Sequence, residues 1–112
     1  MIFITGPLFS GKRAYAMGLL GCDGAAFAAR AVWDVQEQAA ACKSAEELTA
    51  LADRLASRYE VVIATEVGGG VVPIDAAERA GREAAGRLAC LLGARAGRVV
   101  RVFCGIPLTI KG

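Results

Sequence analysis

The chain begins with a short apolar run that ends in a glycine-rich turn, and this feature constrains the fold more than any other. Residues 1–5 are apolar enough for a buried strand, and the next eight are Gly6-Pro7-Leu8-Phe9-Ser10-Gly11-Lys12-Arg13. A strand, this spacing and then a helix are typical of a phosphate-binding P-loop, G-x-x-x-x-G-K-[ST]. Its glycines let the backbone turn tightly, so that N–H groups and the helix N-terminus face an anion.

The motif assigns a task to each of its polar positions. The backbone at Gly6, Ser10 and Gly11 would contact phosphate oxygens, and Lys12 would reach the terminal phosphates. Arg13 stands where a Ser or Thr hydroxyl normally holds magnesium, and a guanidinium cannot ligate a metal. The turn therefore predicts a nucleotide site whose metal chemistry is in question. The alternative is an ordinary turn into a helix, with both basic side chains solvated.

Strands and helices alternate along the rest of the chain. We expect strands over residues 1–5, 31–35, 59–65 and 99–104, a short edge piece over 108–110, and helices over 11–20, from 44 and over 75–93. For 31–35 a helix fits nearly as well. Ser44 and Asp75 are predicted helix caps. With 112 residues, this order predicts one nucleotide-binding domain over 1–112, a three-layer α/β P-loop NTPase-like fold with a mostly parallel sheet.

Composition excludes several classes of protein. The chain is 55% hydrophobic, which excludes disorder, and no apolar stretch approaches the ~20 residues of a membrane helix. The net charge of +2 and 6% aromatic content give no reason to expect nucleic-acid binding. The four cysteines are scattered and histidine is absent, so we expect no zinc site and reduced cysteines in a cytoplasmic protein. No signal peptide is visible.

Three polar features are predicted to meet at one edge of the sheet. Ligands of parallel sheets bind at the carboxyl ends of the strands. The P-loop, Asp34 and Glu66 all fall there. Gly68 and Gly70 follow Glu66 and would let the backbone approach a ligand, although a strained turn explains them too. Glu66 could instead cap its turn, and Asp34 could be a carboxylate on a helix surface.

Several segments resemble one family, the bifunctional adenosylcobinamide kinase / adenosylcobinamide-phosphate guanylyltransferases of cobalamin biosynthesis. The family begins with a strand and T-G-G-x-R-S-G-K-S, which residues 5–13 approximate, and it carries N-E-V-G-x-G-[IV]-V-P, matched over residues 65–73. Its later helix and final strand are matched at Arg79, Arg82, Gly86, Arg87, Gly105, Ile106, Ile110 and Lys111. From Val61 to Lys111 the match runs without a gap.

The chain also departs from the family pattern, so it resembles a shortened, divergent member. Arg13 replaces the hydroxyl residue, and the family's G-R-x-N-Q is here Gly86-Arg87-Leu88-Ala89-Cys90. The family's guanylyltransferase step looks to use a covalent guanylyl group on a histidine, and this chain has no histidine. We therefore expect that activity to be absent. The middle, residues 21–58, is compressed, and the sequence alone gives no secure alignment of it with the family.

The resemblance implies a nucleotide ligand, ATP or GTP, and adenosylcobinamide as the second substrate, in a cytoplasmic homo-oligomer. Lys12 and Glu66 would be catalytic. Glu66 and Asp34 would hold Mg²⁺, although Arg13 counts against the metal, and Arg13 could instead supply positive charge or pair with Asp34. Two alternatives stay open. One is a catalytically silent relative that binds a nucleotide, a corrinoid or a partner, and the other is a P-loop fold that has kept no ligand.

Overall fold

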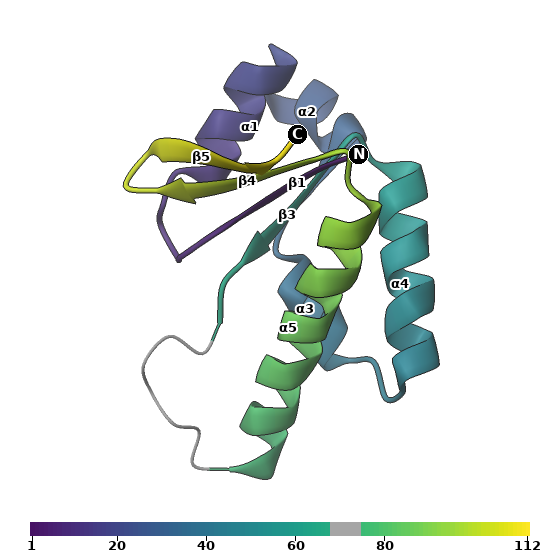
Figure 1. The fold of residues 1–112 in the computed structure, drawn as a ribbon. Helices are drawn as coiled ribbons and strands as arrows, with labels where there is room; N and C mark the ends of the chain where they lie inside the picture. Colours follow the sequence, from purple (N-terminus) through teal and green to yellow (C-terminus); the bar gives the residue numbers. More distant parts are fainter. Residues whose placement is uncertain (68–74) are drawn as a thin grey trace.

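A five-stranded sheet forms the middle layer of the molecule, with its strands in the order β2-β3-β1-β4-β5 (Figure 1). The computed structural model describes residues 1–67 and 75–112. The first four strands pair in parallel, which confirms the predicted mostly parallel sheet, and the last strand pairs antiparallel to β4. Their bounds are β1 Ile2–Gly6, β2 Ala31–Val32, β3 Val61–Thr65, β4 Arg98–Phe103 and β5 Ile106–Lys111.

Helices cover both faces of the sheet (Figure 1). On one face lie α1, Lys12–Leu20, and α2, Gly24–Arg30. On the other face lie α3, Val35–Ala40, α4, Ala45–Arg58, and α5, Ala76–Arg95. The predicted three-layer α/β architecture is confirmed. Among the described residues, no helix is both long enough and apolar enough to cross a bilayer.

Alternation along the strands divides the core into two clusters. Phe3 packs toward α3, α4 and α5, whereas its neighbour Ile4 packs toward α1 and α2. Residues 61–64 of β3 are buried on both sides, which explains why this strand reads as an unbroken apolar run. The sheet is therefore held rigidly between two layers, and the loops at its carboxyl edge rest on a fixed frame.

Three sequence expectations differ from the structure. Residues 31–35 divide between a two-residue strand and the start of α3, so both interpretations hold in part. Gly93 does not end α5, because burial of Leu92 and Ala96 carries the helix on to Arg95 at a cost of about 1 kcal/mol for the glycine. Residues 24–30, for which no element was predicted, form α2.

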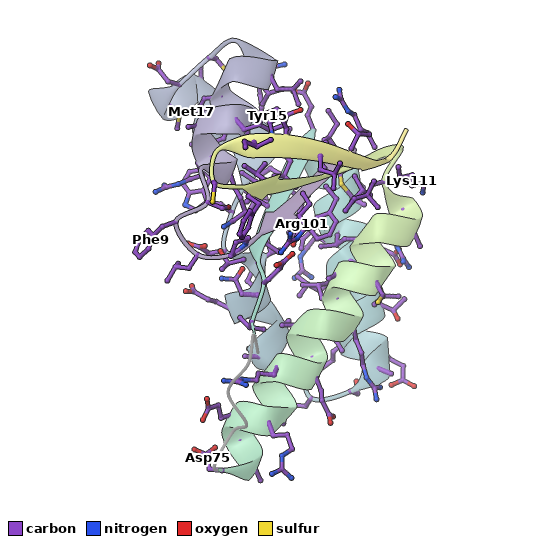
Figure 2. The ribbon with its side chains drawn as sticks, turned by 60° about the vertical axis from the view of Figure 1, so that its left-hand side comes forward. Phe9, Tyr15, Met17, Asp75, Arg101 and Lys111 are labelled. Atoms are coloured by element: carbon purple, nitrogen blue, oxygen red, sulfur yellow. The ribbon has the colours of Figure 1, made fainter. Side chains whose placement is uncertain are left out.

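The alanines in the first turns of α5, which helical spacing would place on an apolar stripe with Leu88 and Leu91, are not buried. Ala77 and Ala80 are exposed, and burial begins at Ala85. Figure 1 shows the reason, because the first turns of α5 extend beyond the end of the sheet and have no layer to pack on. Asp75, which caps this helix, lies at its far end (Figure 2).

Candidate functional site

The turn between β1 and α1 has a backbone shape that glycine alone allows at its ends. Gly6 has φ +155°, and a Cβ there would lie 2.2 Å from the carbonyl oxygen of Val102 in β4. Gly11, at the other end, has φ +92°. Between them, Phe9 adopts φ 57°, which is unusual for a residue with a side chain. The sequence predicted glycines for a tight turn, and the structure adds the close contact with β4.

The turn is fastened to strand ends on both sides. The N–H of Glu66, just after β3, donates to the carbonyl of Gly6 over 2.9 Å. The N–H of Gly105, in the β4–β5 turn, donates to the carbonyl of Ser10 over 2.8 Å. These two bonds fix the loop between the carboxyl ends of β3 and β4, which is where a ligand of a parallel sheet binds.

The first turn of α1 is open to an anion. No side chain caps the helix at Gly11, and its first turn contains no acidic residue. The N–H groups at the start of a helix have no partner within the helix, so an anion or water must satisfy them. Together with the positive end of the helix dipole, they form a binding site for phosphate oxygens.

Lys12 lies inside the loop and is not a solvated surface residue. The residue is only 8% exposed, and its Nζ donates to the carbonyl of Pro7 over 2.6 Å and to Ser10 Oγ over 3.4 Å. Burial lowers the pKa of Lys12 below its usual value, and the negative charges of Asp34 and Glu66 partly oppose that shift. The ammonium group is thus placed where the motif requires a cation.

A cavity of about 350 Å³ opens beside the loop. Its lining includes four of the residues predicted from the P-loop motif and Asp34 from the turn before α3, and comprises Leu8, Phe9, Ser10, Gly11, Lys12, Arg13, Ala14, Trp33, Asp34, Ile63 and Thr65. Asp34 precedes α3 but its carboxylate does not cap that helix. The structure therefore brings together the predicted loop residues and one of the two predicted carboxylates.

Arg13 packs against an aromatic pair and not against a carboxylate. Its Cζ lies 5.3 Å from the centre of the Trp33 ring, and Trp33 stacks on Phe27 with ring centres 5.6 Å apart. The ion pairs between described residues do not include one joining Arg13 to Asp34. Of the alternatives for Arg13, pairing with Asp34 is therefore not the arrangement in the structure.

Glu66 is joined to a residue that sequence reasoning missed. Arg101 of β4 donates from Nε to Oε1 over 2.7 Å and from Nη2 to Oε2 over 2.9 Å. These hydrogen bonds hold the pKa of Glu66 below its usual value. The sequence did contain a hint of this role: Arg101 is a charged residue between Val100 and Val102 in an apolar strand, and both valines are buried in the structure. Gly68 and Gly70 lie outside the described residues.

The residues at the site do not form the usual set of magnesium ligands. The hydroxyl that normally follows the lysine is replaced by Arg13, and both oxygens of Glu66 accept from Arg101. In the part of the chain that the structure describes, no three His, Cys, Asp or Glu side chains cluster so that they could hold a metal ion. Asp34 is the carboxylate that lines the cavity.

A larger hollow lies elsewhere but lacks this chemistry. Between α4 and α5 a depression of about 550 Å³ is lined mostly by apolar side chains, with Glu83 and Arg87 as its charged members. It lies away from the carboxyl ends of the parallel strands, where α/β folds bind ligands. The P-loop cavity, although smaller, is therefore the better candidate.

Comparison with known proteins supports the resemblance found in the sequence. Residues 22–110 match the family model described as cobinamide kinase / cobinamide phosphate guanyltransferase. The chain belongs to this family. The matched region covers well over half of the chain and includes Asp34, Glu66 and Arg101, whereas the P-loop precedes it. No individually curated protein matches the sequence.

Membership of the cobinamide kinase / guanyltransferase family associates the chain with cobalamin biosynthesis and with nucleotide-dependent kinase or transferase chemistry. The substrates that this family implies are a nucleotide and a cobinamide. A cavity with a buried lysine at a P-loop is the kind of site that such chemistry needs.

Proposed function

We propose that the chain is a nucleotide-dependent adenosylcobinamide kinase. It would bind ATP or GTP at the P-loop and transfer the γ-phosphate to the aminopropanol hydroxyl of adenosylcobinamide. The observation that carries the proposal is the buried Lys12, whose ammonium group lies within the loop beside the uncapped start of α1. Family membership supplies the expected acceptor.

In this proposal the loop acts by positioning and by charge. The amides around Gly11 and the first turn of α1 hold the phosphates, as helix N-termini do in other anion sites. Lys12 exchanges the carbonyl of Pro7 for the β- and γ-phosphate oxygens, which are better acceptors because they are charged. Phosphoryl transfer depends mainly on such positioning and on neutralising charge, so these groups supply most of the catalysis.

Glu66 is proposed to orient the acceptor hydroxyl. It lies just beyond β3 at the same sheet edge as the loop, and Arg101 holds its carboxylate in a fixed direction. Guanylyl transfer by the family's histidine route is left out of the proposal, because the chain has no histidine. As the resemblance implies, we place the protein in the cytoplasm as a homo-oligomer.

A second candidate is a catalytically silent relative that binds the nucleotide or the corrinoid without turnover. The observation in its favour is that Arg13 stands at the usual hydroxyl position, where it stacks on Trp33. A guanidinium there cannot take over the hydroxyl's task. The two candidates share the same phosphate site and differ only in turnover.

One titration with one variant tests both candidates. ATP and GTP are titrated into the protein by calorimetry, and product formation with adenosylcobinamide is followed in parallel. Lys12→Ala is expected to weaken binding about tenfold or more and to abolish turnover, since it removes charged hydrogen bonds. Lys43→Ala is the matched control, because Lys43 is exposed and far from the loop in sequence.

Each outcome of this test has a definite consequence. Turnover that is lost in Lys12→Ala and kept in Lys43→Ala supports the kinase. Binding that depends on Lys12 without turnover supports the silent relative. If neither nucleotide binds at millimolar concentration, the kinase and the nucleotide-binding silent relative are both wrong; if adenosylcobinamide does not bind either, only a P-loop scaffold remains.

A further inference from the structure

We infer that this site binds nucleotide phosphates without a divalent cation, and that Arg101 is the positioning residue that keeps Glu66 from binding one. The inference rests on the proposed nucleotide site and specifies how that site neutralises phosphate charge. In the usual P-loop site, a hydroxyl and an acidic side chain help to hold magnesium. In this chain the hydroxyl is replaced by Arg13, and the acidic side chain of Glu66 is paired with Arg101.

The first observation concerns the position after the loop lysine. Arg13 has five N–H donors and no lone pair for a metal ion. Its guanidinium is also engaged, with Cζ 5.3 Å from the centre of the Trp33 ring, at the wall of the phosphate cavity. A positively charged side chain therefore occupies the position from which a magnesium ion is usually held.

The second observation concerns the carboxylate that would hold the metal from the other side. Each oxygen of Glu66 accepts one hydrogen bond from Arg101, at 2.7 and 2.9 Å. A fork of this kind is a strong side-chain pair that occupies one acceptor position on each oxygen, so Glu66 could bind a metal directly only through its remaining lone pairs or by breaking the fork. Arg101 has further support, because its Cζ lies 5.4 Å from the centre of the Phe103 ring.

The order and register of the strands bring Glu66 and Arg101 together at the carboxyl edge of the sheet. Arg101 lies opposite Thr5 in the register of β4 against β1, and Glu66 follows β3 on the other side of β1. The pair thus reaches across the end of the strand that leads into the P-loop. Figure 2 shows Arg101 below the β4–β5 hairpin.

Asp34 is the other carboxylate that could hold a magnesium ion at this site. It lines the cavity and does not cap α3. Magnesium is often held by one or two carboxylates together with the substrate phosphates, so a single aspartate is a sufficient protein ligand in principle. Any test must therefore separate Asp34 from Glu66.

The test measures ATP affinity by calorimetry with excess Mg²⁺ and, separately, with EDTA. In the unaltered protein the two dissociation constants should differ by less than about fivefold. Arg101→Ala frees the carboxylate of Glu66, a residue that lies close enough to the loop for its N–H to bond Gly6 and for its charge to act on Lys12. It should weaken binding in EDTA, and Mg²⁺ should then tighten binding by about tenfold, because an unpaired carboxylate repels the phosphates until a cation joins them.

Two further variants isolate the cause. The double change Arg101→Ala with Glu66→Gln removes the freed carboxylate, so the magnesium effect should fall back below about fivefold. Glu66→Gln alone leaves the Arg101 guanidinium free for the phosphates, and it should tighten binding in EDTA. Thermal melting checks folding, which should persist because Glu66 and Arg101 are each more than a third exposed.

The outcomes separate this inference from the proposed function. If Mg²⁺ tightens binding of the unaltered protein by about fivefold or more, the inference is wrong. Loss of that effect in Asp34→Asn would identify Asp34 as the ligand, and the nucleotide site itself would stand. If Arg101→Ala gains no magnesium dependence, Arg101 is not the positioning residue. If ATP binds in neither buffer, the proposed nucleotide site is wrong, and the inference that depends on it is wrong as well.

Discussion

The N-terminal ends of α1 and α5 lie in the same fold and are finished in opposite ways. At α5, Asp75 Oδ1 accepts from the N–H of Glu78 over 2.6 Å, and α4 begins likewise, with Ser44 Oγ accepting from the N–H of Glu47 over 3.1 Å. At α1 the equivalent residue is Gly11, which has no side chain to accept with. The two longest helices are therefore closed by a side chain, whereas α1, at the sheet edge, is left open, and the short helices α2 and α3 also begin without a side-chain cap.

The charged residues in the first turns of α1, α4 and α5 differ in the same way. The first turn of α4 contains Glu46 and Glu47, and that of α5 contains Glu78, which favours the positive end of each helix dipole. The first turn of α1 contains Lys12 and Arg13 instead. Two cations at a helix N-terminus are repelled by the positive end of the helix dipole, and the first N–H groups of the helix lack acceptors. An anion bound there would offset the repulsion and accept from these N–H groups.

The largest effect is expected where the α1 turn meets β4. Gly6→Ala would place a Cβ 2.2 Å from the carbonyl oxygen of Val102, close to the Ser10 hydroxyl as well. Either β1 or β4 must move, so the free energy of unfolding should fall by about 3 kcal/mol or more. Urea denaturation measures the loss.

Gly18→Ala is the matched control for this change. Gly18 lies within α1, and a Cβ there would meet no atom within 4 Å. Alanine in a helix is more stable than glycine by about 1 kcal/mol, so this variant should gain stability. Equal losses in the two variants would show that the close contact at Gly6 does not constrain the turn.

The next effect tests whether the closed helix ends are purely structural. Ser44→Ala and Asp75→Ala each remove one cap and should each lower the free energy of unfolding by about 1 kcal/mol. Neither should change the affinity for ATP, because both caps lie away from the loop, Asp75 at the far end of α5 (Figure 2). A change in ATP affinity in either variant would break the contrast between the open and the closed ends.

These caps are also the part of the structure that the sequence predicts best. A cap joins residues three apart, so its pattern is visible locally, and both Ser44 and Asp75 act as predicted. The P-loop and the mostly parallel sheet were predictable for the same reason, because strand, turn and helix follow one another along the chain. The family match bears out the resemblance that the sequence suggested.

The Glu66–Arg101 pair could not be predicted in this way. The two residues are 35 positions apart, and they meet only because β3 and β4 flank β1 in the sheet. Strand order is a property of the whole fold and is not encoded in any one segment. The roles proposed for Lys12, Glu66 and Asp34 likewise stay predictions, since geometry brings them to one edge without showing what they bind.

A smaller effect depends on pH and concerns the open end of α1. Burial lowers the pKa of Lys12 below its value of 10.5 in the unfolded chain. Between the lowered pKa and 10.5 the unfolded chain therefore binds more protons, so stability should rise with pH across this window. Lys12→Met should abolish that rise, whereas Lys43→Met should keep it. Urea denaturation from about pH 8 to about pH 10 measures the difference.

The smallest effect is expected at Phe9, whose backbone is strained while its side chain contributes almost no packing. Phe9 has φ 57° and is 94% exposed, and Figure 2 shows it projecting away from the loop. Glycine at this position relieves about 1 kcal/mol of strain, but it also gives the unfolded chain more freedom, by a similar amount. Phe9→Gly should therefore change the free energy of unfolding by only a few tenths of a kcal/mol.

Leu8→Gly provides the comparison, because Leu8 is an exposed apolar neighbour whose φ is not positive. Glycine there adds freedom to the unfolded chain without relieving strain, so this variant should be less stable than Phe9→Gly by about 1 kcal/mol. ATP affinity should be unchanged in Phe9→Gly, since the turn keeps its shape. If both variants lose the same stability, the turn is not strained at Phe9, and the open end of α1 is held by Gly6 and Gly11 alone.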